Sequence, residues 1–97
     1  MEFLADIEVE VEFVIQHSRN LRNIVVKHFE LPGVNFRVTP DSTIGGCLIE
    51  ALDIPPRANH PDGKPRYDLL NFRLTTKLDC SNFQSGQKVL VEKLQFY

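Results

Sequence analysis

Two cysteines and three histidines are the residues of this 97-residue chain best suited to chemistry. A cysteine with a histidine base nearby could act as a nucleophile. However, Cys47 falls on an apolar stripe where a small buried side chain is expected, and Cys80 falls in a polar turn. The histidines, His17, His28 and His60, lie in separate segments without the spacing of a metal site, and the strand-like surroundings of His28 favour a half-buried packing role. We therefore predict no catalytic residue, no metal ligand and no cofactor.

The Gly45-Gly46 pair could bind a phosphate if it opened a helix, because the N–H groups and dipole of a helix start favour anions. No lysine follows the pair, and the Walker and Rossmann patterns are absent. We expect the two glycines instead to allow close packing of a helix against a strand.

Charge is unevenly distributed along the chain, although the net charge is only −2. Residues 1–16 hold five acidic side chains and no Lys or Arg, whereas residues 57–77 are mainly basic. Nucleic-acid binders usually carry a clear basic excess, so we expect no nucleic-acid partner. Pairing between the acidic and basic segments across neighbouring strands is the simpler interpretation.

Length and composition indicate one globular domain over residues 1–97, with 42% hydrophobic and 25% charged residues. Two cysteines are fewer than a small secreted disulfide scaffold usually has, which favours a reducing compartment, the cytoplasm. The start of the chain is acidic and strand-like, unlike a signal peptide. No apolar run is long enough to cross a bilayer, so membrane insertion is not expected.

Strict alternation of apolar and acidic residues predicts a first strand. Its apolar residues are expected on one side: Ile7, Val9, Val11, Phe13 and Ile15. A polar loop at 17–22 and a second apolar run at 24–31 then predict an antiparallel hairpin. Pro32-Gly33 leaves two alternatives, one long strand bent or bulged at that point, which we favour, or a tight turn into a third strand.

A helix is expected over residues 43–52, capped by Ser42 or Thr43 and ended by Pro55-Pro56. Its buried stripe would consist of Ile44, Cys47, Leu48, Ala51 and Leu52. Residues 55–66 contain four prolines and should form an exposed loop, and two further strands follow, near 69–74 and from Val89 onward. The predicted order is ββαββ, an α+β fold with one helix packed on a mixed sheet.

At this point the chain resembles the ubiquitin-like β-grasp superfamily. The resemblance lies in FRVTPDSTIGGCLIEALDIPP, with its helix start and double proline, and in LDCSNFQSGQKVLVEKL at 78–94, the turn before the last strand. Within the superfamily the chain looks most like the YukD/EsaB-type small bacterial proteins associated with type VII secretion. Conjugated members and sulfur carriers end in Gly-Gly, whereas this chain ends KLQFY, so neither activity is expected.

The resemblance implies that recognition occurs on the exposed face of the sheet. The partner-binding residues predicted there are Asn71, Arg73, Leu90, Glu92, Glu10 and Glu12. The expected function is a non-catalytic protein-interaction module, an adaptor or accessory subunit of a bacterial assembly, as a monomer or as a weak homodimer through a strand edge. Two alternatives stay open: a small phage or host-defence inhibitor, and a thiol-dependent small enzyme or carrier.

Overall fold

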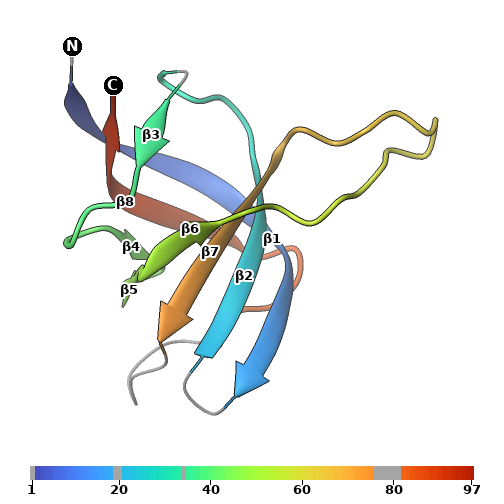
Figure 1. The fold of residues 1–97 in the computed structure, drawn as a ribbon, viewed down its shortest axis with the longest axis horizontal. Coiled ribbons are helices and arrows are strands. Elements are labelled where there is room, and N and C mark those ends of the chain that lie inside the picture. Colours follow the sequence, from blue (N-terminus) through green and yellow to red (C-terminus); the bar gives the residue numbers. More distant parts are fainter. Residues whose placement is uncertain (1, 19–20, 34, 76–81) are drawn as a thin grey trace.

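The computed structural model describes residues 2–18, 21–33, 35–75 and 82–97, and every regular element in them is a β-strand (Figure 1). The strands are β1 (Phe3–Ser18), β2 (Leu21–His28), β3 (Phe36–Arg37), β4 (Thr43–Ile44), β5 (Cys47–Leu48), β6 (Ala51–Asp53), β7 (Leu69–Thr75) and β8 (Lys88–Phe96). They form one sheet in the order β5-β4-β8-β1-β2-β7-β6, and β3 pairs with β8.

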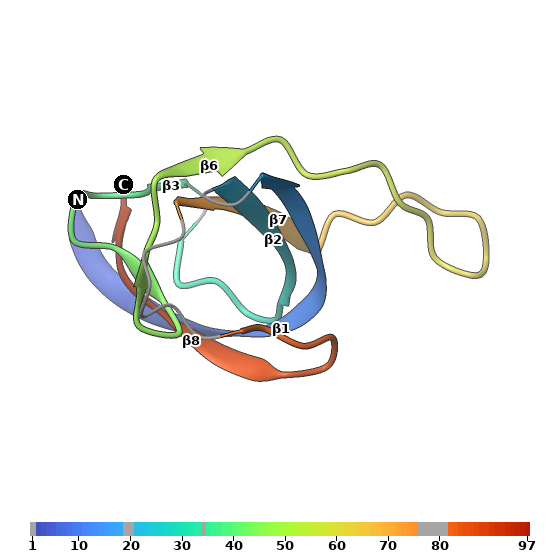
Figure 2. The same cartoon turned by 90° about the horizontal axis from the view of Figure 1, so that it is seen from below.

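The sheet curls strongly around its core (Figure 2). β5 and β6 stand at opposite ends of the strand order, yet only Ile49 and Glu50 separate them along the chain. Glu50 N donates to Arg73 O of β7 over 2.8 Å, which fixes this short link. The three Cα-to-Cα steps from Leu48 to Ala51 span at most about 11 Å, so the two ends of the sheet must lie close together.

The long strand β1 divides the sheet into two halves. Residues 3–10 of β1 pair with β8, and residues 9–18 pair with β2. We call β3, β4, β5, β8 and the first part of β1 the β8 half, and β2, β6, β7 and the second part of β1 the β2 half.

A bulge in β1 corrects the predicted alternation. The register with β2 shifts between Val11 and Phe13, where Glu12 is the extra residue. Such a bulge reverses the side to which the following residues point. Val11 is therefore 1% exposed and lies in the core, whereas Phe13 is 43% and Ile15 37% exposed, on the face of the sheet that points away from the core, here called the outward face.

The predicted helix at 43–52 is wrong, and with it the α+β class, the ββαββ order and the ubiquitin-like resemblance. This segment contains β4, β5 and the start of β6, with Ile44 paired to Cys47 across a two-residue turn. Gly45 and Gly46 have φ values of 55° and 86°. Positive φ at both central residues is the geometry of a type I′ hairpin turn, which glycine adopts readily and a right-handed helix excludes.

Among the described residues no helix packs on the sheet, so the defining layer of a β-grasp domain is missing from them, and the narrower YukD/EsaB assignment fails too. A link to type VII secretion therefore has no support. The described part of the chain also contains no helix long and apolar enough to cross a membrane.

The predicted first hairpin is confirmed as the antiparallel pair β1–β2, although the strands extend further into the polar 17–22 segment than expected. The favoured long strand through Pro32-Gly33 is wrong, because β2 ends at His28. The next strand, β3, has only two residues and pairs with β8. The strands predicted near 69–74 and from Val89 onward are confirmed as β7 and β8.

The core fills the inside of the curled sheet with side chains from both halves. Its fully buried members include Val9, Ile24, Phe72, Val91 and Phe96. Val25 is 0% and Leu69 5% exposed, yet neither belongs to this core, because both point outward. Some outward side chains of the β2 half are thus also shielded from water.

Candidate binding surface

Residues 54–68 form an arm that projects from the sheet between β6 and β7 (Figures 1 and 2). Its four prolines lack the N–H group that a ladder needs, which ends the β6–β7 pairing. At the tip, Gly63 N donates to His60 O over 2.9 Å and His60 N donates to Lys64 O over 2.8 Å. Arg66 N donates to Ala58 O over 2.9 Å. The arm is therefore exposed, as predicted, but its two sides are joined by these hydrogen bonds and by one β-bridge between Asn59 and Pro65.

Arg66 anchors the base of the arm to the body. Its Nη2 lies 2.9 Å from Glu12 Oε1, and its Nε and Nη2 each lie 3.0 Å from an oxygen of Asp68. These side chains are only 18–28% exposed, so water screens the pairs less than at an open surface. The hydrogen bonds from Arg66 lower the pKa of Asp68, and those to Asp68 and then Glu12 raise the pKa of Arg66. The acidic start and the basic 57–77 segment therefore meet in one ion pair, Glu12 with Arg66, but the predicted pairing across neighbouring strands is wrong, because Arg66 lies in the arm and β1 neighbours β2 and β8.

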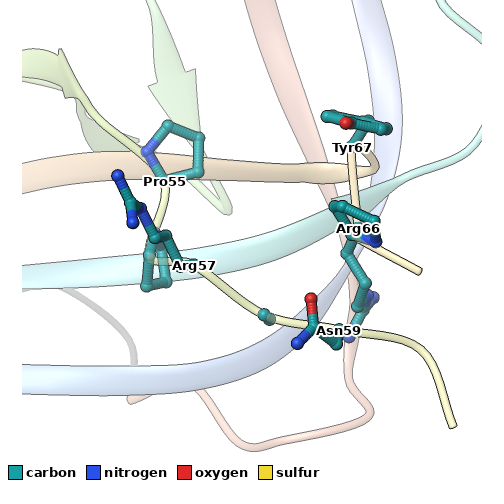
Figure 3. Close-up of a pocket in the computed structure, with 8 residues that line it drawn as sticks. Pro55, Arg57, Asn59, Arg66 and Tyr67 are labelled. Carbon is teal, nitrogen blue, oxygen red and sulfur yellow. The ribbon is translucent and has the colours of Figure 1, made fainter. Parts of the chain in front are cut away.

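A pocket of about 360 Å³ lies between the outgoing and the returning segment of the arm (Figure 3). Its lining consists of Pro55, Pro56, Arg57, Ala58, Asn59, Pro65, Arg66 and Tyr67. Tyr67 is 85% exposed, and Ile54, directly before the pocket residues, is 88% exposed. Arg57 is also exposed and makes no ion pair with any residue that the structure describes. The pocket thus offers apolar rings beside an available cation.

A polar cluster lies on the outward face of the β2 half, at the base of the arm, and consists of His17, Asn23, Asp53, Asn71 and Arg73. Asn23 is 3% and Asn71 8% exposed. Asn23 Nδ2 donates to Asp53 Oδ2 over 2.7 Å and to Asn71 Oδ1 over 2.8 Å, while Asn23 Oδ1 lies 2.7 Å from His17 Nε2. Asn71 Nδ2 donates to Ile54 O over 3.1 Å. The cluster thereby fixes the first residue of the arm.

Arg73 is the cationic member of this polar cluster. Its Nη1 lies 3.8 Å from Asp53 Oδ1, a loose ion pair, and its side chain is 39% exposed. Its Nε is buried and has no hydrogen-bond partner in the described residues. The exposed end of the Arg73 guanidinium therefore has N–H donors that an acidic group of a binding partner could reach.

The structure separates the six predicted partner-binding residues into two groups. Asn71, Arg73 and Glu12 lie in the β2 half, near the arm, although the amide of Asn71 is already occupied. Leu90 and Glu92 lie in β8, opposite Glu8 and Thr43. Glu10 lies between the groups, with Lys27 and Lys88 as its register partners.

Sequence reasoning missed Ile54, Tyr67 and Asn23. A large apolar residue on each side of a proline-rich polar segment was the available signal for Ile54 and Tyr67. Nothing local could identify Asn23, because Asn71, its hydrogen-bond partner, is 48 positions away.

The residues considered for chemistry are dispersed in the fold. Cys47 is 2% exposed in the core, and Cys80 lies outside the described residues. His28 is half-buried, His17 belongs to the polar cluster and His60 to the tip of the arm. Within the described ranges, no three His, Cys, Asp or Glu residues are grouped to hold a metal ion. Gly45-Gly46 lies in a hairpin turn, so the helix dipole considered for phosphate binding is absent there.

In comparisons with known proteins, no protein family, no curated protein and no solved structure matches this chain.

Proposed function

We propose that this chain is a non-catalytic module that binds another protein through the arm and the adjoining outward face of the β2 half. The observation that carries the proposal is the exposure of Ile54 and Tyr67, at 88% and 85%, on an element held in place by Arg66 and Asn71. Large apolar and aromatic side chains act as anchors in protein interfaces. Because the arm is already ordered, binding would cost less conformational entropy.

The chemistry of the arm favours an apolar partner segment with an acidic residue beside it. The pocket lining includes three prolines and Tyr67, and Arg57 supplies an available positive charge. Phe13 and Ile15 extend the apolar area on the outward face. A protein fits better than a nucleic acid, because Arg66 is already neutralised by two carboxylates. We place the binding in the cytoplasm, in keeping with the low number of cysteines.

Affinity purification from the source cell, with the whole chain immobilised, tests this proposal. The arm variant carries Ile54→Ser and Tyr67→Ser. The matched variant carries Leu90→Ser, an exposed apolar residue of the β8 half that belongs to the sequence-predicted face. Circular dichroism and thermal unfolding establish that both variants fold.

The proposal expects proteins captured by the unmodified chain to be retained by Leu90→Ser and depleted at least about tenfold by the arm variant, which corresponds to about 1.4 kcal/mol. Loss of capture with Leu90→Ser alone would place the interface in the β8 half and contradict the proposal.

A further inference from the structure

A groove, separate from the arm, lies beside the first part of β1 in the β8 half. β2 pairs with β1 only as far as His28, opposite Val9, and the chain then diverges from β1. The space left between them has a volume of about 500 Å³. Its lining consists of Ala5, Asp6, Ile7, Glu8, Glu30, Leu31 and Pro32.

The backbone of Asp6 and Glu8 faces this groove. Val11 N donates to Gln87 O over 2.8 Å and Val11 O accepts from Gly86 N over 2.7 Å, so both backbone groups of Val11 point toward β8. This direction alternates along an antiparallel strand. The same groups of Val9 and Ile7 therefore point toward β8, and those of Glu8 and Asp6 point to the opposite side.

These backbone groups form an unused strand edge. Among the described residues, no backbone hydrogen bond joins Asp6 or Glu8 to residues 29–32. The strands at the two ends of the sheet, β5 and β6, are in contrast only two and three residues long, and Pro55 follows β6 closely, which protects these edges from pairing. The first part of β1 is thus the better template for an added strand.

Charge identifies the kind of strand that fits. Asp6, Glu8 and Glu30 line the groove, and no ion pair neutralises them in the described part of the chain, although Asp6 Oδ1 already accepts the N–H group of Lys93 on β8. A second copy of this chain, paired through the same edge, would set acidic residues against acidic residues, which is unfavourable. A strand with alternating basic residues would instead complement them.

We propose that the Asp6–Glu8 edge binds an extended segment of a partner protein, rich in Lys or Arg, by strand addition. Backbone hydrogen bonds to Asp6 and Glu8 would supply affinity, and the acidic side chains would select basic residues. This site lies in the other half of the molecule from the arm, so it holds or fails independently of the function proposed above.

Fluorescence anisotropy with a labelled alternating Lys–Val hexapeptide tests the site on the whole chain. Two further versions carry backbone N-methyl groups, on the lysines in one and on the valines in the other. N-methylation removes donors without changing charge, and only one set of N–H groups in an added strand faces β1. Strand addition therefore requires one methylated version to bind like the parent and the other to lose at least about tenfold in affinity. Equal binding by both versions would overturn the proposal, as would failure of the parent peptide to bind.

Two substitutions of Glu8 distinguish the contribution of its backbone N–H group to peptide binding from that of its side-chain charge. Glu8→Pro removes an N–H group that the β1–β8 ladder does not use, and Glu8→Gln removes only the charge. We expect Glu8→Pro to weaken peptide binding more than Glu8→Gln, and Glu92→Gln, on β8, to leave it unchanged. If Glu8→Pro does not fold, the two methylated peptides still decide the question. If the chain dimerises and the peptide disrupts the dimer, the edge binds a second copy of the chain, and the proposed partner is wrong.

Discussion

The outward face of the sheet differs between the two halves of the molecule. In the β8 half it carries exposed residues such as Glu8, Lys88 and Leu90. In the β2 half, Asn23 and Val25 are at most 3% exposed, although they point away from the core. Around Asn23 the outward face is organised like an interior, because the amides of Asn23 and Asn71 are satisfied by neighbouring protein groups rather than by water, whereas the buried Nε of Arg73 has no partner in the described residues.

Buried polar groups also serve different purposes in the two halves. In the β8 half, Ser42 is 0% exposed, and its Oγ donates to Lys93 O over 2.8 Å. Lys93 has a φ of 60°, and Asp6 Oδ1 accepts its N–H over 2.9 Å. The register between β1 and β8 shifts between Ala5 and Ile7, so β8 carries a bulge at Lys93, and these groups hold that bulge in place. In the β2 half the bonds of Asn23 run between side chains, and they organise a surface at the base of the arm.

The largest expected effect comes from breaking the polar cluster. Asn23→Leu leaves Asp53, Asn71 and His17 without their shared partner, and should lower the free energy of unfolding by about 2–4 kcal/mol. Urea unfolding measures this change. Glu92→Gln, an outward substitution in the β8 half, should stay within about 0.5 kcal/mol of the unmodified chain. Similar losses in the free energy of unfolding for the two variants would contradict the difference proposed between the outward faces of the two halves.

A smaller loss is expected from the buried serine of the β8 half. Ser42→Ala removes the donor to Lys93 O and the acceptor for Thr39 N, at a cost of about 1–2 kcal/mol. Thr39 is only half-buried, and its Oγ1 donates to Lys93 O over a longer 3.3 Å, so Thr39→Val should cost less in the same urea titration. A larger loss for Thr39→Val would mean that Ser42 does not hold the bulge.

The ion pairs of Arg66 at the base of the arm should give the smallest change in the free energy of unfolding, and this change should depend on pH. Asp68→Asn should cost about 1 kcal/mol at pH 7, since the ion pair is only partly shielded. The pKa of Asp68 is lowered in the folded state, so its contribution is present above the unfolded pKa and is lost as the pH falls below about 4.

Urea midpoints at pH 7 and at pH 2 measure this loss. The difference between the unmodified chain and Asp68→Asn should be present at pH 7 and nearly absent at pH 2. A difference of the same size at both values would show that Asp68 contributes through something other than its charge.

The four long strands were largely predictable from the sequence, and the connection between the halves, including β6, was not. A continuous apolar run identified β2, whose residues 22–26 are all buried, and alternation identified β1, β7 and β8. It missed the reversal at Glu12, since a bulge needs no special residue and is defined by its partner strand.

The error at 43–52 has a specific cause. Ile44, Cys47 and Leu48 recur at a spacing that suits a helix, but Ile44 and Cys47 also fit the two sides of a tight hairpin. Gly45-Gly46 between them should have decided for the hairpin, because glycine pairs are typical of type I′ turns. The polar cluster was beyond prediction, since it depends on the register of β2, β6 and β7.

The contrast between the halves depends on this segment, because it carries the chain from β4, paired with β8, to β6, paired with β7. Gly46→Ala tests its conformation most directly, since nothing lies within 4 Å of the added methyl group and only the backbone responds. A residue with a φ of 86° should destabilise the protein by about 1 kcal/mol on this change. Stabilisation by a similar amount, as alanine gives in a helix, would contradict the all-β connection.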